Sequence, residues 1–459
     1  MSVRFSQLDG ARVGVWGAGR EIASFADQLA RRLPSARIAV AAFDGTPPED
    51  VRDTLRAPDA RILTVEIDGG EEVVAALAAC DVVVRSPGVS IHRSEMRALR
   101  ESGMPVTTAT ALWLAEHGGE GVIGVTGTKG KSTTAALACH LARAVGRRAS
   151  LAGNIGVPAL DLLDGDAADV TVLELSSYHI ADLDTGPEVA VVTSLFREHT
   201  DWHGSEEAYH ADKLRLLSLP GVRKAVINAR DERLARAIAE LAPADTPTLL
   251  FGVPERWDVS AEAILSKGEP VARLDQLPLR GEHNALNLCG ALTALEALGV
   301  SPPPPLPAAL HGFLPLAHRL ETVAESDGVL WVNDSISTTP ESTLAALASF
   351  PGREVVVIAG GQDRGQDYAE LGRVLAETGA TVIGVPSTGP RVIAAAADAG
   401  APSSRAIEAA DMREAVALTR TLARPGSVIL LSPAAPSYDN YRDFAQRGER
   451  FRALVEQRT

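Results

Sequence analysis

The sequence contains few cysteines and no long hydrophobic run, and both absences limit what the protein can be. Its three cysteines, Cys80, Cys139 and Cys289, are far apart and form no CxxC pair, so we expect buried, reduced thiols and no thiolate zinc site. No apolar stretch reaches the roughly 18 residues of a membrane-spanning helix. The opening residues, MSVRFSQLDG, lack the apolar core of a signal peptide. We therefore expect a soluble, cytoplasmic protein without membrane insertion.

Positive charge is also scarce. The chain has 44 lysines and arginines against 59 acidic residues, which gives a formal net charge of -15. A nucleic-acid partner is therefore not expected, because such proteins normally present a basic face. A phosphate site needs only local positive charge, so a nucleotide enzyme remains compatible with this composition. With 459 residues, 46% of them hydrophobic and 22% charged, the chain is expected to fold into several domains.

The order of apolar segments predicts three α/β blocks. We expect strands at 12–16, 37–42 and 81–85 in the first block; near 121–126, at 170–175, 189–194 and 224–228 in the second, which ends in a helix at 284–298; and at 330–333, 354–359, 380–385 and 428–431 in the third. Strands that alternate with helices predict parallel sheets. The proline-rich stretch at 301–307 favours a stiff connector and a boundary region.

These blocks predict the fold class α/β with three domains. We place an N-terminal domain at residues 1–106, a central domain at 107–302 and a C-terminal domain at 303–459. Ligands are expected at the carboxyl ends of the strands and in clefts between domains.

A glycine-rich loop follows the strand that opens the second block. The sequence TGTKGKST at 126–133 places Gly-Lys-Ser between that strand and a helix expected at 134–143. Backbone N–H groups of such a loop, together with the helix N-terminus, surround phosphate oxygens. Lys131 would reach the β- and γ-phosphates, and Ser132 would ligate Mg²⁺. Val125 replaces the first glycine of the usual pattern, and a glycine turn that merely opens a helix is the alternative.

A weaker glycine pattern follows the first strand. Gly14, Gly17 and Gly19 fit part of the GxGxxG pattern, but its third glycine would fall at Ile22. Because Asp44 ends the next strand, a nucleotide-diphosphate site is one interpretation. A tight turn without a ligand is the other.

The loop TGTKGKST resembles the modified phosphate loop of the Mur ligases and folylpolyglutamate synthases, and further motifs follow in the same family order. They are SPG at 86–88, GNIG at 153–156, ELSS at 174–177, EHxD at 198–201, Lys213, NAxD at 228–231, GxHNxxN at 281–287, HR at 318–319, NDS at 333–335 and SPAA at 432–435. The segments GNIGVPA and SPAAPSYD, followed by Phe444 and Gln446-Arg447-Gly448, are most similar to the glutamate-adding, MurD-like branch.

The resemblance implies a fold and an activity. The implied fold has an N-terminal Rossmann-like UDP-binding domain, a central P-loop ATPase domain with a parallel sheet and a C-terminal Rossmann-like α/β domain. The implied activity is ATP-dependent ligation of glutamate to UDP-N-acetylmuramoyl-L-alanine through an acyl phosphate, in peptidoglycan biosynthesis. ATP and Mg²⁺ are the implied cofactors, these two substrates are the small-molecule partners, and a monomer is expected.

The resemblance also assigns roles to residues. The implied catalytic residues are Lys131, Glu174, His199 and Lys213; the last three, with Ser132, would hold metal, Lys213 as a carbamate. The implied ATP-binding residues are Gly127, Thr128, Lys129, Gly130, Lys131, Ser132, Thr133, Asn284, Asn287, Arg319 and Asp334. The implied UDP-substrate residues are Gly17, Asp44, Ser86, Asn154, Ser176 and Ser177, and the implied glutamate-binding residues are Thr338, Arg364, Ser437 and Phe444. A solvated strand-end glutamate, a structural histidine and a surface lysine are the alternatives for Glu174, His199 and Lys213.

The sequence departs from the usual D-glutamate-adding pattern near the expected amino-acid pocket. NDSISTT at 333–339 carries Ile336 where that pattern has lysine, and Arg364 stands at the position of another pocket lysine. Isoleucine cannot pair with a carboxylate, whereas arginine can bind one with two hydrogen bonds. The variant resembles a branch that adds L-glutamate, whose product a separate epimerase then converts. D-glutamate addition, a folylpolyglutamate-synthase-like ligase and a nucleotide-dependent switch remain alternatives.

Overall fold

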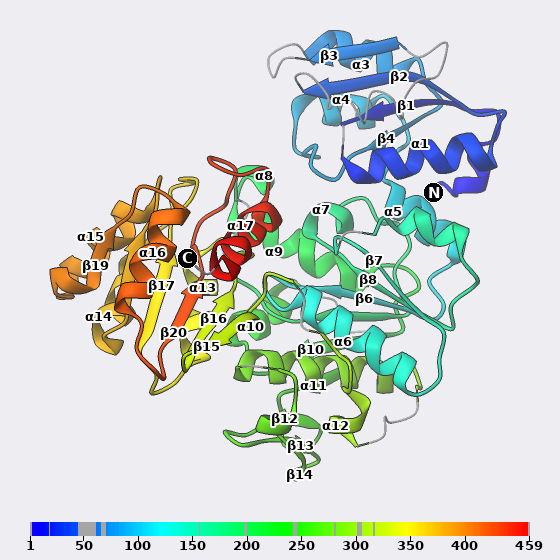
Figure 1. Ribbon diagram of the computed structural model, residues 1–459. Coiled ribbons are helices and arrows are strands. Elements are labelled where there is room, and N and C mark those ends of the chain that lie inside the picture. Colours follow the sequence, from blue (N-terminus) through cyan, green and yellow to red (C-terminus); the bar gives the residue numbers. More distant parts are fainter. Residues whose placement is uncertain are drawn as a thin grey trace. The chain divides into compact units, whose positions relative to one another are not determined.

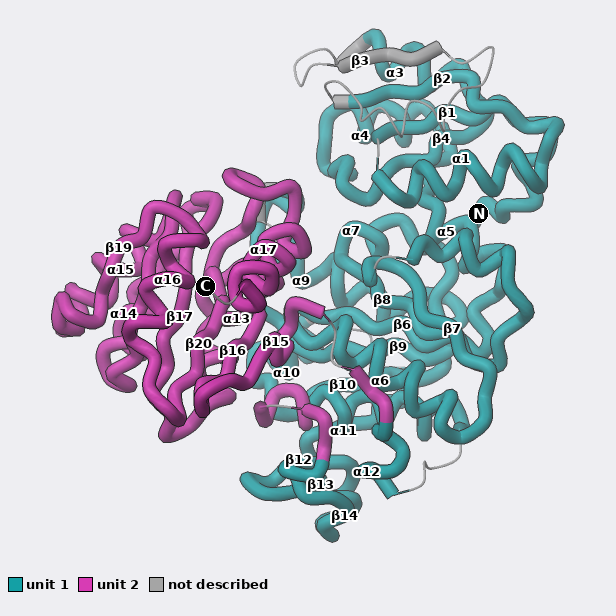
Figure 2. The backbone as a smooth tube through the Cα atoms, viewed as in Figure 1, with its two compact units in different colours: residues 1–276, 286–311 teal, residues 277–285, 312–459 magenta. Residues whose placement is uncertain are grey.

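The protein divides into two compact units (Figure 2). Unit 1 comprises residues 1–276 and 286–311, and unit 2 comprises 277–285 and 312–459. The computed structural model describes residues 2–17, 19–44, 61–65, 70–155, 157–196, 200–241, 246–279, 281–300, 305–314 and 317–457. Within these ranges, every helix is too short or too polar to cross a lipid bilayer. The proposed domain limits at residues 106 and 302 stay predictions.

The first sheet of unit 1 is parallel and has the strand order β3-β2-β1-β4-β5. Figure 1 labels the first four of these strands. Its strands are β1 (Arg12–Trp16), β2 (Arg37–Asp44), β3 (Arg61–Val65), β4 (Val82–Arg85) and β5 (Val106–Thr107). Its helices are α1 (Arg20–Arg32), α3 (Gly70–Ala78) and α4 (Ser94–Glu101). The three strands expected here from the sequence are all present.

The second sheet of unit 1 is also parallel, with the order β11-β10-β9-β6-β8-β7. Its strands are β6 (Val122–Thr126), β7 (Ala149–Gly153), β8 (Val170–Glu174), β9 (Val189–Val192), β10 (Lys224–Asn228) and β11 (Thr248–Phe251). Its helices are α5 (Ala109–His117), α6 (Lys131–Ala144), α7 (Ser177–Ile180), α8 (Thr200–His203), α9 (Glu206–Leu214), α10 (Glu232–Leu241) and α11 (Glu282–Ala297). The first turn of α11, residues 282–285, belongs to unit 2. The register sets Val125 opposite Glu174 and Thr126 opposite Val192, so the carboxyl ends of β6, β8 and β9 meet at one edge.

A small antiparallel sheet in unit 1 was not expected from the sequence. It consists of β12 (Trp257–Val259), β13 (Ala263–Ser266) and β14 (Glu269–Arg273), and α12 (Leu306–Ala309) packs against β14. The α12 helix begins within the proline-rich stretch that was expected to remain extended.

Unit 2 contains a six-stranded sheet in the order β15-β16-β20-β17-β18-β19. Its strands are β15 (Glu321–Ser326), β16 (Val329–Asn333), β17 (Val355–Ala359), β18 (Thr381–Gly384), β19 (Ala406–Glu408) and β20 (Val428–Leu431). Its helices are α13 (Pro340–Ala348), α14 (Ala369–Thr378), α15 (Gly389–Asp398), α16 (Met412–Leu422) and α17 (Phe444–Glu456). Only β15 runs antiparallel to its neighbour. The four strands expected here are all present, and the α/β fold class is confirmed.

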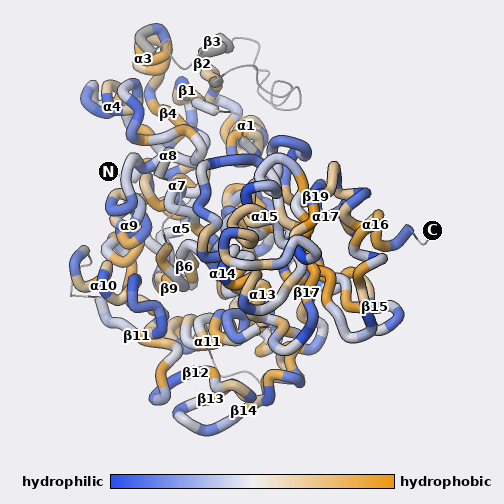
Figure 3. Tube along the Cα trace, turned by 90° about the vertical axis from the view of Figure 1, so that its left-hand side faces the viewer, coloured by the Kyte–Doolittle hydropathy of each residue, from blue (hydrophilic) through white to orange (hydrophobic). Residues whose placement is uncertain are grey.

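Local capping and burial explain these elements. Helix α9 begins where Ser205 accepts a hydrogen bond from the Ala208 N–H, and α5 ends at Gly118 in the left-handed conformation. All five residues of β17 are buried, as expected for a strand covered on both faces of a parallel sheet. Figure 3 shows this strand among the hydrophobic segments of unit 2.

A buried ion pair links the two large sheets of unit 1. Arg85, at the end of β4, and Asp182, just after α7, both have fully buried side chains and pair with each other. The same arginine donates to the carbonyls of Val89 and Tyr178. Arg100 also pairs with Asp182, but its side chain is 39% exposed. Removing one member of a buried pair leaves an uncompensated charge. We therefore expect Arg85 to contribute far more than Arg100 to the free energy of unfolding.

We predict that Arg85→Ala lowers the free energy of unfolding by roughly 3–5 kcal/mol. The matched control, Arg100→Ala, removes a half-exposed partner of the same carboxylate and should lower it by about 1 kcal/mol or less. Urea unfolding followed by circular dichroism measures both. Equal decreases in the free energy of unfolding of the two variants would show that the burial of Arg85 does not determine how much its ion pair with Asp182 stabilises the fold.

Candidate active site

The glycine-rich loop that the sequence predicts to bind phosphate lies between β6 and α6. Gly127 has φ 139° and Gly130 has φ 87°, which side chains other than glycine rarely adopt. A Cβ atom on Gly127 would lie 2.1 Å from Thr193 Oγ1, and one on Gly130 would lie 2.4 Å from Asn287 Oδ1. A larger residue at either position would therefore clash with its neighbours and would also strain the backbone.

The end of β9 holds this loop in place. The Thr128 N–H donates to the Ser194 carbonyl at 2.8 Å, and the Lys129 N–H donates to Ser194 Oγ at 2.9 Å. Thr193 Oγ1 donates to the Lys129 carbonyl at 2.6 Å. The Thr128 hydroxyl lies 2.9 Å from the Tyr209 hydroxyl on α9. The loop is thus fixed by two neighbouring elements before any ligand binds.

Three predicted ATP-binding residues open helix α6. Lys131 is its first residue, and its ammonium donates to the Thr128 carbonyl at 2.9 Å. Ser132 follows it at the helix N-terminus, where backbone N–H groups favour an anion. Thr133 Oγ1 is buried, and the described ranges contain no hydrogen-bond partner for it. A strand, a glycine loop and a helix N-terminus in this order can bind a nucleotide polyphosphate.

Glu174 ends the neighbouring strand β8 and is 1% exposed. Its Oε1 accepts a hydrogen bond from Asn154 Nδ2 at 2.8 Å. Its Oε2 is buried and has no hydrogen-bond partner among the residues that the structure describes. Because Glu174 is buried, the strand-end surface residue considered as an alternative is excluded.

Lys213 is also buried, at 2% exposure, so it is not a surface lysine. Its Nζ donates to the Gly127 carbonyl at 3.0 Å and lies 4.6 Å from the centre of the Tyr209 ring. Helix α9 therefore directs Lys213 to the first glycine of the phosphate loop. His199 lies outside the described residues.

The described donors suit a hard divalent cation. The unpartnered Glu174 carboxylate oxygen and the hydroxyl of Ser132 are oxygen ligands of the kind that Mg²⁺ prefers. Lys213 could join them only as a carbamate, because an ammonium carries no lone pair.

A second site is a cavity of about 210 Å³ in unit 1. It is lined by Gly19, Arg20, Glu21, Ser86, Pro87, Gly88, Gly153, Asn154, Pro158, Ser176, Tyr178 and His179. Three predicted UDP-substrate residues, Ser86, Asn154 and Ser176, thus come together here from three separate loops. Glycine backbone, hydroxyls and an arginine beside a helix start can receive a phosphorylated sugar nucleotide.

The other three predicted UDP-substrate residues stand apart from this cavity. Gly17 packs closely against Ser86, which lines the cavity, since a Cβ atom on Gly17 would lie 2.5 Å from Ser86 Cβ. Ser177 turns away, and its hydroxyl lies 3.0 Å from His203 Nε2. Asp44 ends β2, but its side chain lies outside the described residues.

The cavity wall contains a hydrogen-bonded relay that the sequence did not reveal. Ser176 Oγ lies 2.6 Å from His179 Nδ1, and His179 Nε2 lies 2.7 Å from Glu21 Oε1. Thr110 donates to the same carboxylate oxygen at 2.8 Å. Burial would raise the pKa of Glu21, but the charge and hydrogen bond of His179 lower it overall. The relay fixes Ser176, and the i, i+3 spacing of Ser176 and His179 was its only sequence signal.

Asp334, in unit 2, is buried and accepts hydrogen bonds from three separate segments. Its Oδ2 accepts from Ser337 Oγ at 2.5 Å and from Ser432 Oγ at 2.9 Å, and its Oδ1 accepts from the Leu320 N–H at 3.1 Å. Burial raises the pKa of Asp334 to about 6, although these bonds and the nearby Arg319 oppose the rise.

Arg447, on α17, connects the loops expected to bind glutamate. Its Nε donates to Ser335 Oγ at 3.0 Å, and its Nη2 donates to the Ser335 carbonyl at 2.8 Å. Its Nη1 donates to the carbonyls of Ala435, Pro436 and Gly360. Burial lowers the pKa of Arg447 to about 10. The sequence contained this arginine in a family motif but gave no sign of its role.

The four predicted glutamate-binding residues all lie in unit 2, around these connected loops. Arg364 is exposed, and its guanidinium lies 5.7 Å from the centre of the Tyr438 ring, next to the buried Ser437. The Phe444 carbonyl accepts from Ser335 Oγ at 2.8 Å. Thr338 lies half-buried just after the Asp334 loop. An exposed guanidinium above a rigid loop cluster can receive a carboxylate.

The remaining predicted ATP-binding residues are distributed between the units. Asn287, in unit 1, contacts Gly130 of the phosphate loop, as described above. Asn284, Arg319 and Asp334 belong to unit 2, and their contribution to an ATP site stays a prediction.

Comparison with known proteins identifies related domains over much of the chain. Residues 125–295 match the Mur ligase middle domain, and residues 318–435 match the Mur ligase glutamate ligase domain. UDP-N-acetylmuramoyl-L-alanine--L-glutamate ligases of Micromonospora sp. and Salinispora tropica are each 44% identical, with 99% of this chain aligned to 98% and 99% of theirs. The enzyme of that name from Xanthomonas campestris pv. campestris is 40% identical, over 99% of this chain and 97% of its own.

Solved structures share the fold at low sequence identity. The UDP-N-acetylmuramate-alanine ligase MurC of Thermotoga maritima is 17% identical, aligns over 97% of this chain and 99% of its own, and has a TM-score of 0.59. The MurF ligase of Thermotoga maritima in complex with ADP is 18% identical, aligns over 100% of this chain and 99% of its own, and has a TM-score of 0.58.

The raised pKa of Asp334 predicts a pH-dependent contribution to stability. Below pH about 4 the Asp334 side chain is protonated in both the folded and the unfolded state. Between pH about 4 and 6 only the folded state keeps the proton, so the contribution of Asp334 to the free energy of unfolding falls as pH rises. The difference in free energy of unfolding between wild type and Asp334→Asn should therefore decline by roughly 3 kcal/mol from pH 4 to pH 7. Urea unfolding at a series of pH values measures it. A difference that grows with pH would contradict a raised pKa.

Proposed function

The chain belongs to the Mur ligase family, and from this premise we propose that it uses ATP to join L-glutamate to UDP-N-acetylmuramoyl-L-alanine in peptidoglycan biosynthesis. The observation that carries this proposal is the 44% identity, over 99% of the chain, to ligases with that activity in their name. The replacement of a pocket lysine by Ile336 and the presence of Arg364 support the same amino acid.

The chemistry must bring two anions together. ATP transfers its γ-phosphoryl group to the alanyl carboxylate and becomes ADP. The glutamate amine then attacks the carbonyl carbon of the acyl phosphate, phosphate leaves, and the nitrogen loses a proton to give the amide. Repulsion between the carboxylate and the polyphosphate opposes the first step. Lys131 stands at the start of α6 with its ammonium against the loop, where it would neutralise the polyphosphate.

Mg²⁺ is proposed as the second source of positive charge. Ser132, Glu174 and a carbamylated Lys213, with His199, would hold the ion or ions. Mg²⁺ supplies charge neutralisation at the phosphate oxygens when it is bound. Two observations support this assignment: Glu174 Oε2 has no hydrogen-bond partner within the described part of the chain, and Lys213 is buried near the loop.

The two organic substrates are proposed to occupy separate regions. The 210 Å³ cavity lined by Ser86, Asn154 and Ser176 would receive part of the UDP-sugar. Arg364 would bind a glutamate carboxylate, with Ser437, Thr338 and Phe444 around it. An epimerase acting on the product, the monomeric state and the cytoplasmic location stay predictions.

A ligase and a nucleotide switch differ in when they consume ATP. We predict that ADP release requires UDP-N-acetylmuramoyl-L-alanine and L-glutamate together, and that Lys131→Ala abolishes it while the protein stays folded. Steady-state ADP release and circular dichroism measure this. The matched control is Arg147→Ala, which removes an exposed cation beyond the other end of α6.

Two results would contradict this assignment. Rapid ADP release with neither substrate present would favour the nucleotide switch. Near-normal turnover of Lys131→Ala would show that the loop assignment is wrong, because the loss of a charge-assisted contact to phosphate should slow the reaction by at least about tenfold.

Lys213 is expected to act as a carbamate. Lys213→Ala should be nearly inactive, and a short carboxylic acid such as acetate should restore part of the activity by replacing the carbamate. Bicarbonate should not rescue it, since no amine remains at this position. Full activity of Lys213→Ala would exclude the carbamate role.

A further inference from the structure

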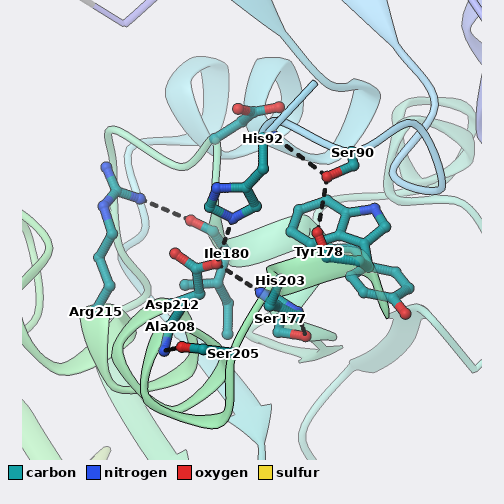
Figure 4. A network of polar contacts seen from close by, with 12 residues as sticks. Ser90, His92, Ser177, Tyr178, Ile180, His203, Ser205, Ala208, Asp212 and Arg215 are labelled. Atoms are coloured by element: carbon teal, nitrogen blue, oxygen red, sulfur yellow. Dashed lines mark hydrogen bonds and ion pairs between the residues drawn. The ribbon is translucent and has the colours of Figure 1, made fainter. Parts of the chain in front are cut away.

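Two histidines and an aspartate meet in unit 1, outside the residues proposed above to bind substrates. His92 follows the SPG loop of the first sheet, His203 ends α8, and Asp212 lies on α9. Figure 4 shows the three side chains directed toward one another. His203 Nδ1 lies 2.7 Å and His92 Nε2 lies 3.4 Å from Asp212 Oδ2, and one ligand atom of each residue falls within 4.8 Å of the others.

We propose that His92, His203 and Asp212 bind a divalent transition-metal ion of the Zn²⁺ class. Imidazole nitrogens select this class over Mg²⁺, and one carboxylate completes a common three-ligand set. Metal–ligand bonds of about 2.1 Å in a tetrahedron separate ligand atoms by about 3.4 Å, which is the present distance between His92 and Asp212. The His203 Nδ1–Asp212 Oδ2 distance of 2.7 Å is shorter than this and must lengthen when the ion binds, which a rotation of the Asp212 carboxylate would allow.

The residues around His203 allow its Nδ1 atom to bind a metal ion. Its side chain is fully buried, and its Nε2 lies 3.0 Å from Ser177 Oγ. A serine hydroxyl can donate or accept, so the imidazole proton can move from Nδ1 to Nε2 and leave the Nδ1 lone pair for the ion. The ion exchanges three of its waters for two nitrogens and one oxygen; the His203–Asp212 hydrogen bond is replaced, and no covalent bond of the protein breaks.

The remaining geometry allows an ion to enter. The His92 side chain is 41% exposed, whereas that of Asp212 is 18% exposed. The ring of His92 packs edge-on against Trp202 at 5.5 Å, so the histidine is oriented although it faces solvent. The three ligands come from the loop after β4, from α8 and from α9. A bound ion would therefore connect the first sheet of unit 1 to the helix that carries Lys213.

The test uses the full chain without nucleotide or substrate, titrated with Co²⁺ and Zn²⁺. Co²⁺ should produce visible d–d absorption bands, and Zn²⁺ should displace it and raise the melting temperature. Loss of a residue that only hydrogen-bonds to a metal ligand weakens a metal site by about 10- to 100-fold, so loss of the ligand itself in His92→Ala should weaken binding at least about tenfold. His311→Ala, which removes another exposed histidine, is the matched control.

A second pair of variants separates this site from the proposed nucleotide-linked metal site. Lys213→Ala should retain the Co²⁺ bands, and Asp212→Asn should lose them. Because His92 is half-exposed in a loop, His92→Ala is expected to fold. Equal Co²⁺ affinity in His92→Ala and His311→Ala would overturn the proposal and leave the three residues as a hydrogen-bonded joint. Loss of the bands in Lys213→Ala alone would assign the ion to the nucleotide site.

Discussion

The contact between the buried Lys213 side chain, whose Nζ donates a hydrogen bond, and the Gly127 carbonyl is the interaction on which the central site depends. A buried lysine needs compensating contacts, and here they include a loop carbonyl and the face of Tyr209. The same tyrosine hydroxyl lies beside Thr128. Helix α9 therefore positions the phosphate loop as well as the lysine, and the loop in turn requires glycine at 127 because Thr193 occupies the space beside it.

Parallel strands explain why the candidate residues meet. The register of β6, β8 and β9 brings the phosphate loop, Glu174 and Thr193 to one edge of the sheet, although they are far apart in sequence. In unit 2 a buried side chain brings the candidate residues together. Arg447 donates hydrogen bonds to carbonyl and hydroxyl oxygens in the loops after β16, β17 and β20. Backbone topology assembles one site, and a buried cation assembles the other.

The sequence predicted the parallel sheets well because their strands are continuous apolar runs, such as β17. It did not reveal the β12–β14 sheet, whose strands are short and partly polar, such as Glu269–Arg273. Contacts between distant residues were also out of reach, because no periodicity connects Glu21 to His179 or Arg85 to Asp182. The phosphate loop was predictable because strand, glycines and helix are contiguous there.

The central claim of this account is the addition of L-glutamate, and the most direct measurement is product formation with each enantiomer. The full chain is supplied with ATP, Mg²⁺ and UDP-N-acetylmuramoyl-L-alanine, and the product is quantified by mass spectrometry. The account predicts a product heavier by one glutamyl residue and a higher kcat/KM for L-glutamate than for D-glutamate. A preference for D-glutamate of about tenfold or more, equivalent to roughly 1.4 kcal/mol in transition-state binding, would contradict it.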